Sequence, residues 1–342
     1  MPSRVFLVSE SLRGDDMSAL KKILVAAVFV MCGQLGLMAK ASARITLGLS
    51  DWPGWVAWYV AQHNGYLKKY GAHVRLVWFP SYMTSVEALS AGRIDANCQA
   101  LIDTIAPIAK EVPLKVVLVT DNSAGNDALM VNDHIRSFAA LKGKSIAVEM
   151  NSIEEYLDVT ALHEHHMRAS EVHFVNMSTG NSAAALITGR VSAAGVWNPW
   201  IQRIEARKAG HSLFTSAQAP GLIPDLVVAR ASVLAAHRKD FVGLAKAWFA
   251  TVRFIKAHPR KAAAIMAPHV DLTPAVYAAS LSGTRLFGAR LNKIAMNPGR
   301  SRVSLYNSTI ETSRFLAEVK MVNATPNPRA FVDAGIVSQA AR

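Results

Sequence analysis

Short apolar runs alternate with stretches of helical periodicity along the first two thirds of the chain. Apolar runs of strand length occur at 45–50, 73–79, 145–150 and 172–177. Each is followed by a segment whose small and apolar residues recur at helical spacing, and this alternation favours sheets built from right-handed βαβ units. After Ala231 the pattern becomes mostly helical, and residues 240–258 place their apolar side chains on one face.

A repeat within this pattern predicts two similar α/β lobes. The segment SVEALSAGRIDANCQ (85–99) matches SAAALITGRVSAAGV (182–196) at a constant offset of 97 positions. Each copy predicts a short helix, a glycine that ends it, and a strand. The alternative is that a Gly-Arg connection after a helix of small residues is common in α/β proteins. The strands that open each unit agree in order as well, which favours the repeat.

Two extended passages connect the predicted lobes. Residues 116–131 are strand-like on both sides of a polar centre, and residues 220–230 form a second such passage. Two crossings between two lobes form a hinge. We therefore predict a first lobe from residues 44–122 and 226–342, and a second lobe from residues 123–225.

The N-terminal segment has the pattern of a secretory signal peptide. Lys21 and Lys22 precede an apolar run from Ile23 to Met38, and Ala-Ser-Ala at 41–43 provides a small-residue cleavage site. A membrane anchor would need roughly 20 apolar residues, and this run is shorter and diluted by glycine and glutamine. We expect residues 1–43 to be removed on export.

Composition narrows the class of protein. The 342 residues are 51% hydrophobic and 18% charged, which is typical of a globular chain. The net charge is +13, and loss of five Lys/Arg and three Asp/Glu with residues 1–43 leaves +11. The basic residues are scattered, so we expect no nucleic acid partner. Only Cys98 remains in the exported chain, which excludes an intramolecular disulfide and a cysteine-based zinc site.

Four motifs in this order give the chain a family resemblance. They are NGYLKKYGAHV (64–74), ALSAGRIDA (88–96), LKGKSIAVE (141–149) and GVWNPW (195–200). The chain resembles the periplasmic substrate-binding proteins of ABC importers, in the nitrate/sulfonate/taurine (NMT1-like) family. The resemblance implies an α/β, two-lobed, type II periplasmic-binding-protein fold, with a mostly parallel sheet flanked by helices in each lobe and two hinge crossings.

The resemblance also implies a function and a location. Such a protein binds a small solute between its lobes in the periplasm and delivers it to a permease, which works with an ATPase in the inner membrane. It implies no catalysis, and we expect a monomer with no cofactor and no metal.

Candidate ligand-binding residues lie at the predicted strand ends, where ligands gather in open α/β sheets. They are Ser50, Asp51, Trp52, Tyr82, Asn97, Gln99, Asn122, Asn126, Glu149, Asn151, Ser152, Trp197, Asn198 and Asp225. Each polar residue could instead cap a helix or hold the hinge. The resemblance places Trp197 beside the ligand, whereas Trp55 and Trp200 are expected to pack.

The stretch LSDWPGW (49–55) follows the first strand and combines an acid with two tryptophans. Pro53 suits the first turn of a helix, for which Ser50 or Asp51 would be the N-cap. Trp52 would then form one aromatic wall of the cleft, opposite Trp197.

The candidate residues are acidic and aromatic rather than basic. Asp51, Glu149 and Asp225 lie at strand ends, and a buried carboxylate without a partner is costly. This pattern favours a cationic, zwitterionic or amide-like ligand: a guanidine- or urea-like solute, taurine or a sulfonate, or a heteroaromatic amine. The alternative is that these acids cap helices or pair across the hinge. The sequence does not identify the ligand.

Two other functions stay open. His163, His165 and His166 could indicate an enzyme, but their spacing differs from the metalloprotease motif and spreads the rings over different helix faces, so we expect a solvated surface. A metal-ion carrier would need clustered histidines and carboxylates in the cleft. A thiamine-pyrimidine-precursor binding or synthesis protein would share the fold, although such enzymes carry a cysteine-rich segment that this chain lacks.

Overall fold

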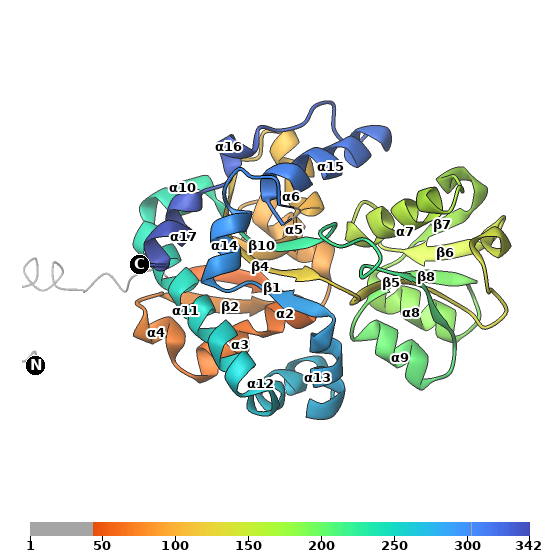
Figure 1. Ribbon diagram of the computed structural model, residues 1–342, viewed down its shortest axis with the longest axis horizontal. Helices are drawn as coiled ribbons and strands as arrows, with labels where there is room; N and C mark the ends of the chain where they lie inside the picture. Colours follow the sequence, from red (N-terminus) through yellow and green to blue (C-terminus); the bar gives the residue numbers. More distant parts are fainter. Residues whose placement is uncertain (1–43, 302) are drawn as a thin grey trace, which may run out of the picture. The chain divides into compact units, whose positions relative to one another are not determined.

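The structure is a computed structural model that describes residues 44–301 and 303–342. The signal peptide predicted over residues 1–43 lies outside these residues. Within them, strands form two sheets (Figure 1). None of the described helices combines the length and the apolar character that crossing a membrane requires.

The first sheet has six strands in the order β11-β4-β10-β3-β1-β2. Its strands are β1 (Ile45–Leu49), β2 (Val74–Trp78), β3 (Ala96–Ala100), β4 (Leu114–Ser123), β10 (Pro224–Arg230) and β11 (Thr284–Leu286). Strand β1 pairs in parallel with β2 and β3, whereas β10 pairs antiparallel with both β3 and β4, and β11 antiparallel with β4.

The second sheet has five strands in the order β7-β6-β8-β5-β9. Its strands are β5 (Asp127–Val131), β6 (Ser145–Val148), β7 (His173–Asn176), β8 (Ala193–Trp197) and β9 (His211–Thr215). Strand β6 pairs in parallel with β7 and β8, and β5 pairs antiparallel with β8 and β9.

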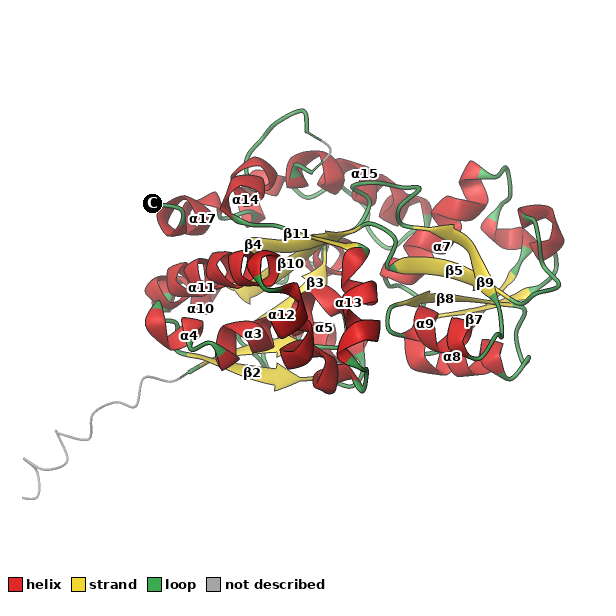
Figure 2. Ribbon diagram, turned by 60° about the horizontal axis from the view of Figure 1, so that its bottom comes forward, coloured by secondary structure: helices red, strands yellow, loops and turns green. Residues whose placement is uncertain are grey.

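Helices cover both sheets (Figure 2). The α-helices are α2 (Pro53–Val56), α3 (Trp58–His63), α4 (Tyr66–Lys69), α5 (Tyr82–Ser90), α6 (Ile102–Ala109), α7 (Ile153–Glu164), α8 (Thr179–Ile187), α9 (Trp200–Ala206), α10 (Ala231–Ala236), α11 (Arg238–Ala257), α12 (Pro259–Met266), α13 (Pro274–Ser282), α14 (Ala289–Ala295), α15 (Leu305–Glu318), α16 (Pro328–Phe331) and α17 (Ala334–Ala340). Short 3₁₀ helices cover Phe138–Leu141, Ala169–Glu171 and Ala267–Val270. The helix predicted over 240–258 is confirmed as α11, whose apolar face is buried.

The repeat predicted from the sequence is confirmed. Helix α5 is followed by Gly92 at φ 74° and by β3, and helix α8 is followed by Gly189 at φ 71° and by β8. Only a residue without a Cβ adopts these positive φ values at little cost. The two glycines therefore end equivalent helices and start equivalent strands.

The two extended passages are also confirmed as strands. The chain leaves the first sheet along β4 and enters the second through β5, and it returns to the first sheet along β10. Because β4 and β10 carry the chain in opposite directions, they pair antiparallel. The expectation of mostly parallel sheets holds for β1–β3 and β6–β8 and is wrong for the strands at the crossings.

Candidate functional site

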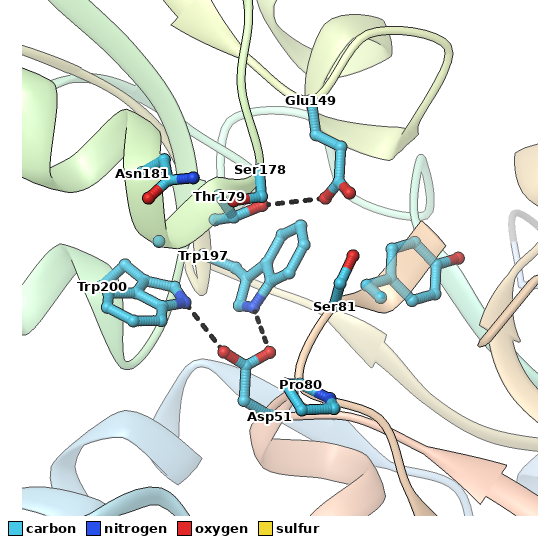
Figure 3. Close-up of a pocket in the computed structure, with 11 residues that line it drawn as sticks. Asp51, Pro80, Ser81, Glu149, Ser178, Thr179, Asn181, Trp197 and Trp200 are labelled. Carbon is cyan, nitrogen blue, oxygen red and sulfur yellow. Dashed lines mark hydrogen bonds between the residues drawn. The ribbon is translucent and has the colours of Figure 1, made fainter. Parts of the chain in front are cut away.

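A cavity of about 250 Å³ lies at the carboxyl ends of strands from both sheets, and we call it the outer pocket. Its lining residues follow β1, β2, β6 and β7 or end β8, so both halves of the repeat contribute to it. They are Asp51, Pro80, Ser81, Tyr82, Glu149, Ser178, Thr179, Gly180, Asn181, Trp197 and Trp200 (Figure 3). No lysine or arginine is among these residues.

Two helices of the repeat begin at the outer pocket. Ser81 is the N-cap of α5 and Ser178 is the N-cap of α8, and neither side chain caps its helix by a hydrogen bond. The two serines are 97 positions apart, which is the offset of the repeat. Backbone N–H groups at such helix starts have no partner within the helix. They can donate hydrogen bonds to a carbonyl, carboxylate or sulfonate oxygen in the pocket.

Asp51 follows β1 of the first sheet and is hydrogen-bonded to two residues at or just after the end of β8 in the second sheet. Its carboxylate accepts hydrogen bonds from the indole N–H of Trp197 at 3.0 Å and of Trp200 at 2.8 Å (Figure 3). Burial raises the pKa of Asp51 above its usual value, although these two hydrogen bonds oppose the shift. The expected capping role is wrong, because Trp52 is the N-cap of α2. Trp200 packs against the hydrophobic core as expected, and it also lines the pocket.

Glu149 follows β6 and brings a second carboxyl group to the pocket. Its Oε2 accepts a hydrogen bond from the Thr179 hydroxyl at 3.2 Å (Figure 3). Burial raises the pKa of Glu149 to about 7, so near neutral pH the group exists both as an acid and as a carboxylate. It can therefore donate a hydrogen bond to a ligand or accept one.

Tyr82 and Trp197 provide aromatic surface. Their rings meet edge to face with centroids 5.8 Å apart. The Tyr82 hydroxyl donates to Asp103 Oδ2 at 2.5 Å and accepts from the Ala100 N–H at 2.9 Å, which fixes the ring. The arrangement gives a flat ligand two aromatic faces held by hydrogen bonds.

Trp52, Trp55 and Asp225 line a second, smaller cavity. The Trp52 indole N–H donates to Asp121 Oδ1 at 2.8 Å. Trp55, expected in the core, is buried there and also lines this cavity.

Several predicted site residues hold the fold instead of lining either cavity. Asn97 donates to Ser85 and Gln99, and Gln99 donates to Thr104 and to a backbone carbonyl, all within the first lobe. Ser152 is the N-cap of α7, where its hydroxyl accepts from the N–H of Glu154.

The remaining predicted residues lie elsewhere. Asn126 donates to Ser280 and Thr284 and accepts from Asn198, so it connects three segments at the crossing. Asn151 is exposed and has φ 62°. Ser50 and Asn122 are buried but line neither cavity.

Sequence reasoning missed part of the outer pocket. The missed residues are Pro80, Ser81, Ser178, Thr179, Gly180, Asn181 and Trp200. The repeat could have found most of them, because Ser178 to Asn181 correspond to Ser81 to Thr84 at the offset of 97. A ligand that lies between two repeated units contacts the equivalent helix start of each unit.

The described residues contain no group of three or more His, Cys, Asp or Glu that could hold a metal ion. His163, His165 and His166 are exposed, and the His165 ring stacks on Phe138 with centroids 3.8 Å apart. The histidine cluster therefore lies apart from the outer pocket.

Comparisons with known proteins agree on one family of relatives. Residues 52–262 match the family model described as NMT1/THI5 like. A protein of Brucella abortus, named provisionally as a binding protein, is 28% identical over 165 residues, which are 47% of this chain and 50% of that protein. A protein of Haemophilus influenzae, named provisionally as a thiamine biosynthesis protein, is 26% identical over 178 residues, which are 51% of this chain and 56% of that protein. The chain spans about half the length of these curated relatives.

A solved structure shows the same fold. The periplasmic aliphatic sulphonate binding protein SsuA from Escherichia coli superposes with a TM-score of 0.70 at 17% identity, covering 86% of this chain and 99% of that chain. The two-lobed periplasmic-binding-protein fold predicted from the sequence is confirmed.

Proposed function

We propose, from the premise that the chain belongs to the NMT1/THI5-like family, that it is the solute-binding component of an ABC importer. In this proposal it captures a small, polar, nitrogen-containing solute between its two lobes and delivers it to a membrane permease. The observation that carries the proposal is the outer pocket, which receives residues from the strand ends of both sheets. A solute that contacts both lobes stabilises the arrangement in which the lobes are together. This arrangement distinguishes a hinged binding protein with bound solute from the empty protein.

Several findings support a binding role in the periplasm. The name of the Brucella relative describes a binding protein, and SsuA, which shares the fold, is described as a periplasmic binding protein. The signal-peptide pattern in residues 1–43 fits export. Sequencing of the exported protein should start at Arg44, and a mature N-terminus within residues 1–43 would argue against this cleavage site.

The pocket chemistry favours a ligand with both N–H donors and an acceptor oxygen. Asp51 and Glu149 offer carboxyl oxygens, and the starts of α5 and α8 offer backbone N–H groups. A bare anion would meet these two acids with no lysine or arginine among the lining residues. An amide, a urea-like solute or an amino-sulfonate satisfies both sets of groups, whereas a guanidine-like solute satisfies only the acids and a heteroaromatic amine offers a ring nitrogen as its acceptor.

We further propose which residues contact the solute and where the lobes divide. Asp51, Tyr82, Glu149 and Trp197 stay from the predicted set, and Trp200 joins them. The lobes are residues 44–122 with 226–342, and residues 123–225, with the crossings at the ends of β4 and β10.

The second candidate is binding of a thiamine pyrimidine precursor. The name of the Haemophilus relative favours it, and in this candidate an aminopyrimidine ring lies in the outer pocket against the aromatic surface of Tyr82 and Trp197, with its amino group at Glu149. This candidate differs from the first in the ligand and not in the site.

A thermal-shift panel tests both candidates. Taurine, simple alkylsulfonates, nitrate, urea, guanidine and aminopyrimidines would be added to the exported protein. A raised unfolding temperature with a nitrogen-containing solute supports the proposal, and the best solute should lose about tenfold in affinity with Glu149→Gln. Tight binding of nitrate or an alkylsulfonate that Glu149→Gln leaves unchanged would reject the proposed ligand class.

A further inference from the structure

The smaller cavity adjoins the outer pocket, and we call it the inner cavity. Its lining residues are Trp52, Trp55, Tyr82, Ala100, Asp127, Ile153, Trp197, Ile223 and Asp225. Tyr82 and Trp197 also line the outer pocket, so their edge-to-face contact separates the two spaces. The volume of the inner cavity that the centre of a water-sized group can occupy is about 10 Å³. One water molecule or one ammonium group needs about that much room.

Two acids from different sheets meet at the inner cavity. Asp225 lies in β10 of the first sheet, and Asp127 opens β5 of the second. Both side chains are buried, with 3% and 2% of their surface exposed. Each keeps one carboxyl oxygen, Oδ2, without a hydrogen-bond partner among the described residues. A buried acceptor without a donor costs stability, so each of these two oxygens calls for a donor.

No lysine or arginine is among the residues that line the inner cavity. Burial raises the pKa of Asp127 to about 7 and that of Asp225 well above its usual value. Contact between Asp225 and Asp121, and between Asp127 and Glu154, needs a proton shared by each pair. Other ionisable groups buried nearby are Asp103, Glu149, Asp158, Tyr82 and Tyr277. No lysine or arginine in the described part of the chain is buried.

Aromatic rings form the rest of the wall. The Trp52 and Trp55 rings have centroids 6.3 Å apart, and the Trp55 and Tyr82 rings have centroids 5.2 Å apart. Aromatic faces beside carboxylates attract a cation, and the attraction grows when water is excluded. The inner cavity therefore combines the two features that bind an organic ammonium ion, in a space too small for a bulky head group.

We propose that the inner cavity is a subsite for the primary ammonium group of the solute, held by Asp127 and Asp225, while the rest of the solute lies in the outer pocket. This inference rests on the proposed function and narrows its ligand class. The solute carries –NH₃⁺ at one end of a narrow chain, and this chain reaches the inner cavity only when the Tyr82 and Trp197 rings, which are in contact in the structure, move apart. Its other end bears an acceptor for the N–H groups at the starts of α5 and α8.

The subsite is tested with pairs of solutes that differ only at the nitrogen atom. The exported protein is used without any substitution. Calorimetry would compare taurine and 4-aminobutanoate with the same two compounds carrying a trimethylammonium group in place of the primary ammonium group. Trimethylation removes all three N–H donors and enlarges the head beyond the cavity. We expect the best primary amine to bind at least about tenfold more tightly than its trimethylated partner. Equal affinity of the two would overturn the subsite and leave the inner cavity to a water molecule only.

Near-isosteric variants test whether Asp127 and Asp225 cause the preference for the primary amine. Asp225→Asn and Asp127→Asn should each weaken binding of the best amine about tenfold or more and change binding of its trimethylated partner little. Asp158→Asn is the matched control, because Asp158 is fully buried with both oxygens unpartnered and lines neither cavity. It should keep the preference for the primary amine. The assignment to Asp127 and Asp225 would be overturned if Asp158→Asn lost the preference for the primary amine. It would also be overturned if Asp225→Asn and Asp127→Asn both kept that preference.

The outcomes for the subsite and for the proposed function differ. If nitrogen-containing solutes bind and trimethylation has no effect, the importer function stands and the subsite is refuted. If only anions without nitrogen donors bind, both are refuted. If one of the two test variants fails to fold, the other variant and the solute pairs still decide.

Discussion

Among single residues, Asp51 connects the strand ends of the two lobes by two hydrogen bonds. Its carboxylate accepts an indole N–H from Trp197 and another from Trp200, both of which follow the second repeat. These hydrogen bonds do not need a solute. They favour the arrangement in which the two lobes meet, and a solute that approaches Asp51 competes with them or adds to them.

Removing one of these donors should loosen the protein. Trp200→Phe keeps an aromatic ring but removes the N–H that lies 2.8 Å from Asp51. We expect the free energy of unfolding to fall by about 1 kcal/mol, since a hydrogen bond to a charged group is lost. Urea unfolding without solute measures it. Trp78→Phe is the control, because the half-buried Trp78 indole donates no hydrogen bond among the described residues; an equal loss in both variants would contradict the role of the N–H.

Buried acids should make stability depend on pH. Burial raises the pKa of Asp121 to about 6 and those of Asp103, Asp127 and Glu149 to about 7. The folded protein then binds more protons than the unfolded chain between about pH 4 and 7. The stability from these groups is present at low pH and is lost as the pH rises through 6 to 7. The free energy of unfolding should therefore fall between pH 5 and pH 8.

Urea unfolding of Asp127→Asn at both pH values checks this dependence. The variant should show a smaller fall than the wild type, because one of the titrating groups is gone. Glu87→Gln, at an exposed position on α5, should leave the fall unchanged. An equal fall in Asp127→Asn and the wild type would remove Asp127 from the titrating set.

Among the elements, α2 lies close to β4 because it has a glycine at the point of contact. A Cβ on Gly54 would lie 2.3 Å from Asp121 Oδ2 and 2.6 Å from Oδ1. Asp121 cannot move freely, because Trp52 and Asp225 hold it. The close approach of α2 to β4 is what brings Trp52 over the acids of the inner cavity.

Gly54→Ala should destabilise the protein by about 1–3 kcal/mol, as other overpacked sites do. Gly299→Ala is the matched control, since a Cβ there would meet nothing within 4 Å. Thermal unfolding of both variants, without solute, gives the comparison. A neutral Gly54→Ala would show that α2 can shift without cost, and that Trp52 is not held where the structure has it.

At the scale of the whole molecule, the two strands that cross between the sheets define the hinge. Strands β4 and β10 pair with each other in the first sheet, and the chain crosses between the sheets at residues 124–126 and 216–223. The residues of the outer pocket come from both sides of these crossings. A solute that contacts both sides adds interactions only when the lobes are together.

Solution scattering should therefore show a smaller radius of gyration when a solute that raises the unfolding temperature is added at saturation. A solute from the same panel that leaves the unfolding temperature unchanged is the control. An unchanged radius with the bound solute would contradict hinge closure.

The sequence by itself determined the two-lobed α/β fold. Local pattern was sufficient for the repeat of helix, glycine and strand at 85–99 and 182–196, for the two extended crossings and for the apolar face of α11. These features depend on periodicity and on the conformational freedom of glycine, which are properties of neighbouring residues. The same logic placed Asp51, Tyr82, Glu149 and Trp197 at one edge, because strand ends meet there.

Tertiary structure alone decided how those side chains are used. Asn97 and Gln99 also end a strand, yet they bond to each other and to Thr104, because their strand is covered by α5 and α6. Trp200 packs against the core and also reaches the pocket, where Asp51 of the other lobe accepts its N–H. The direction of β10 and the meeting of Asp127 with Asp225 depend on how the chain crosses between the sheets. Contacts between residues about 100 positions apart follow from the path of the whole chain, and no local pattern contains them.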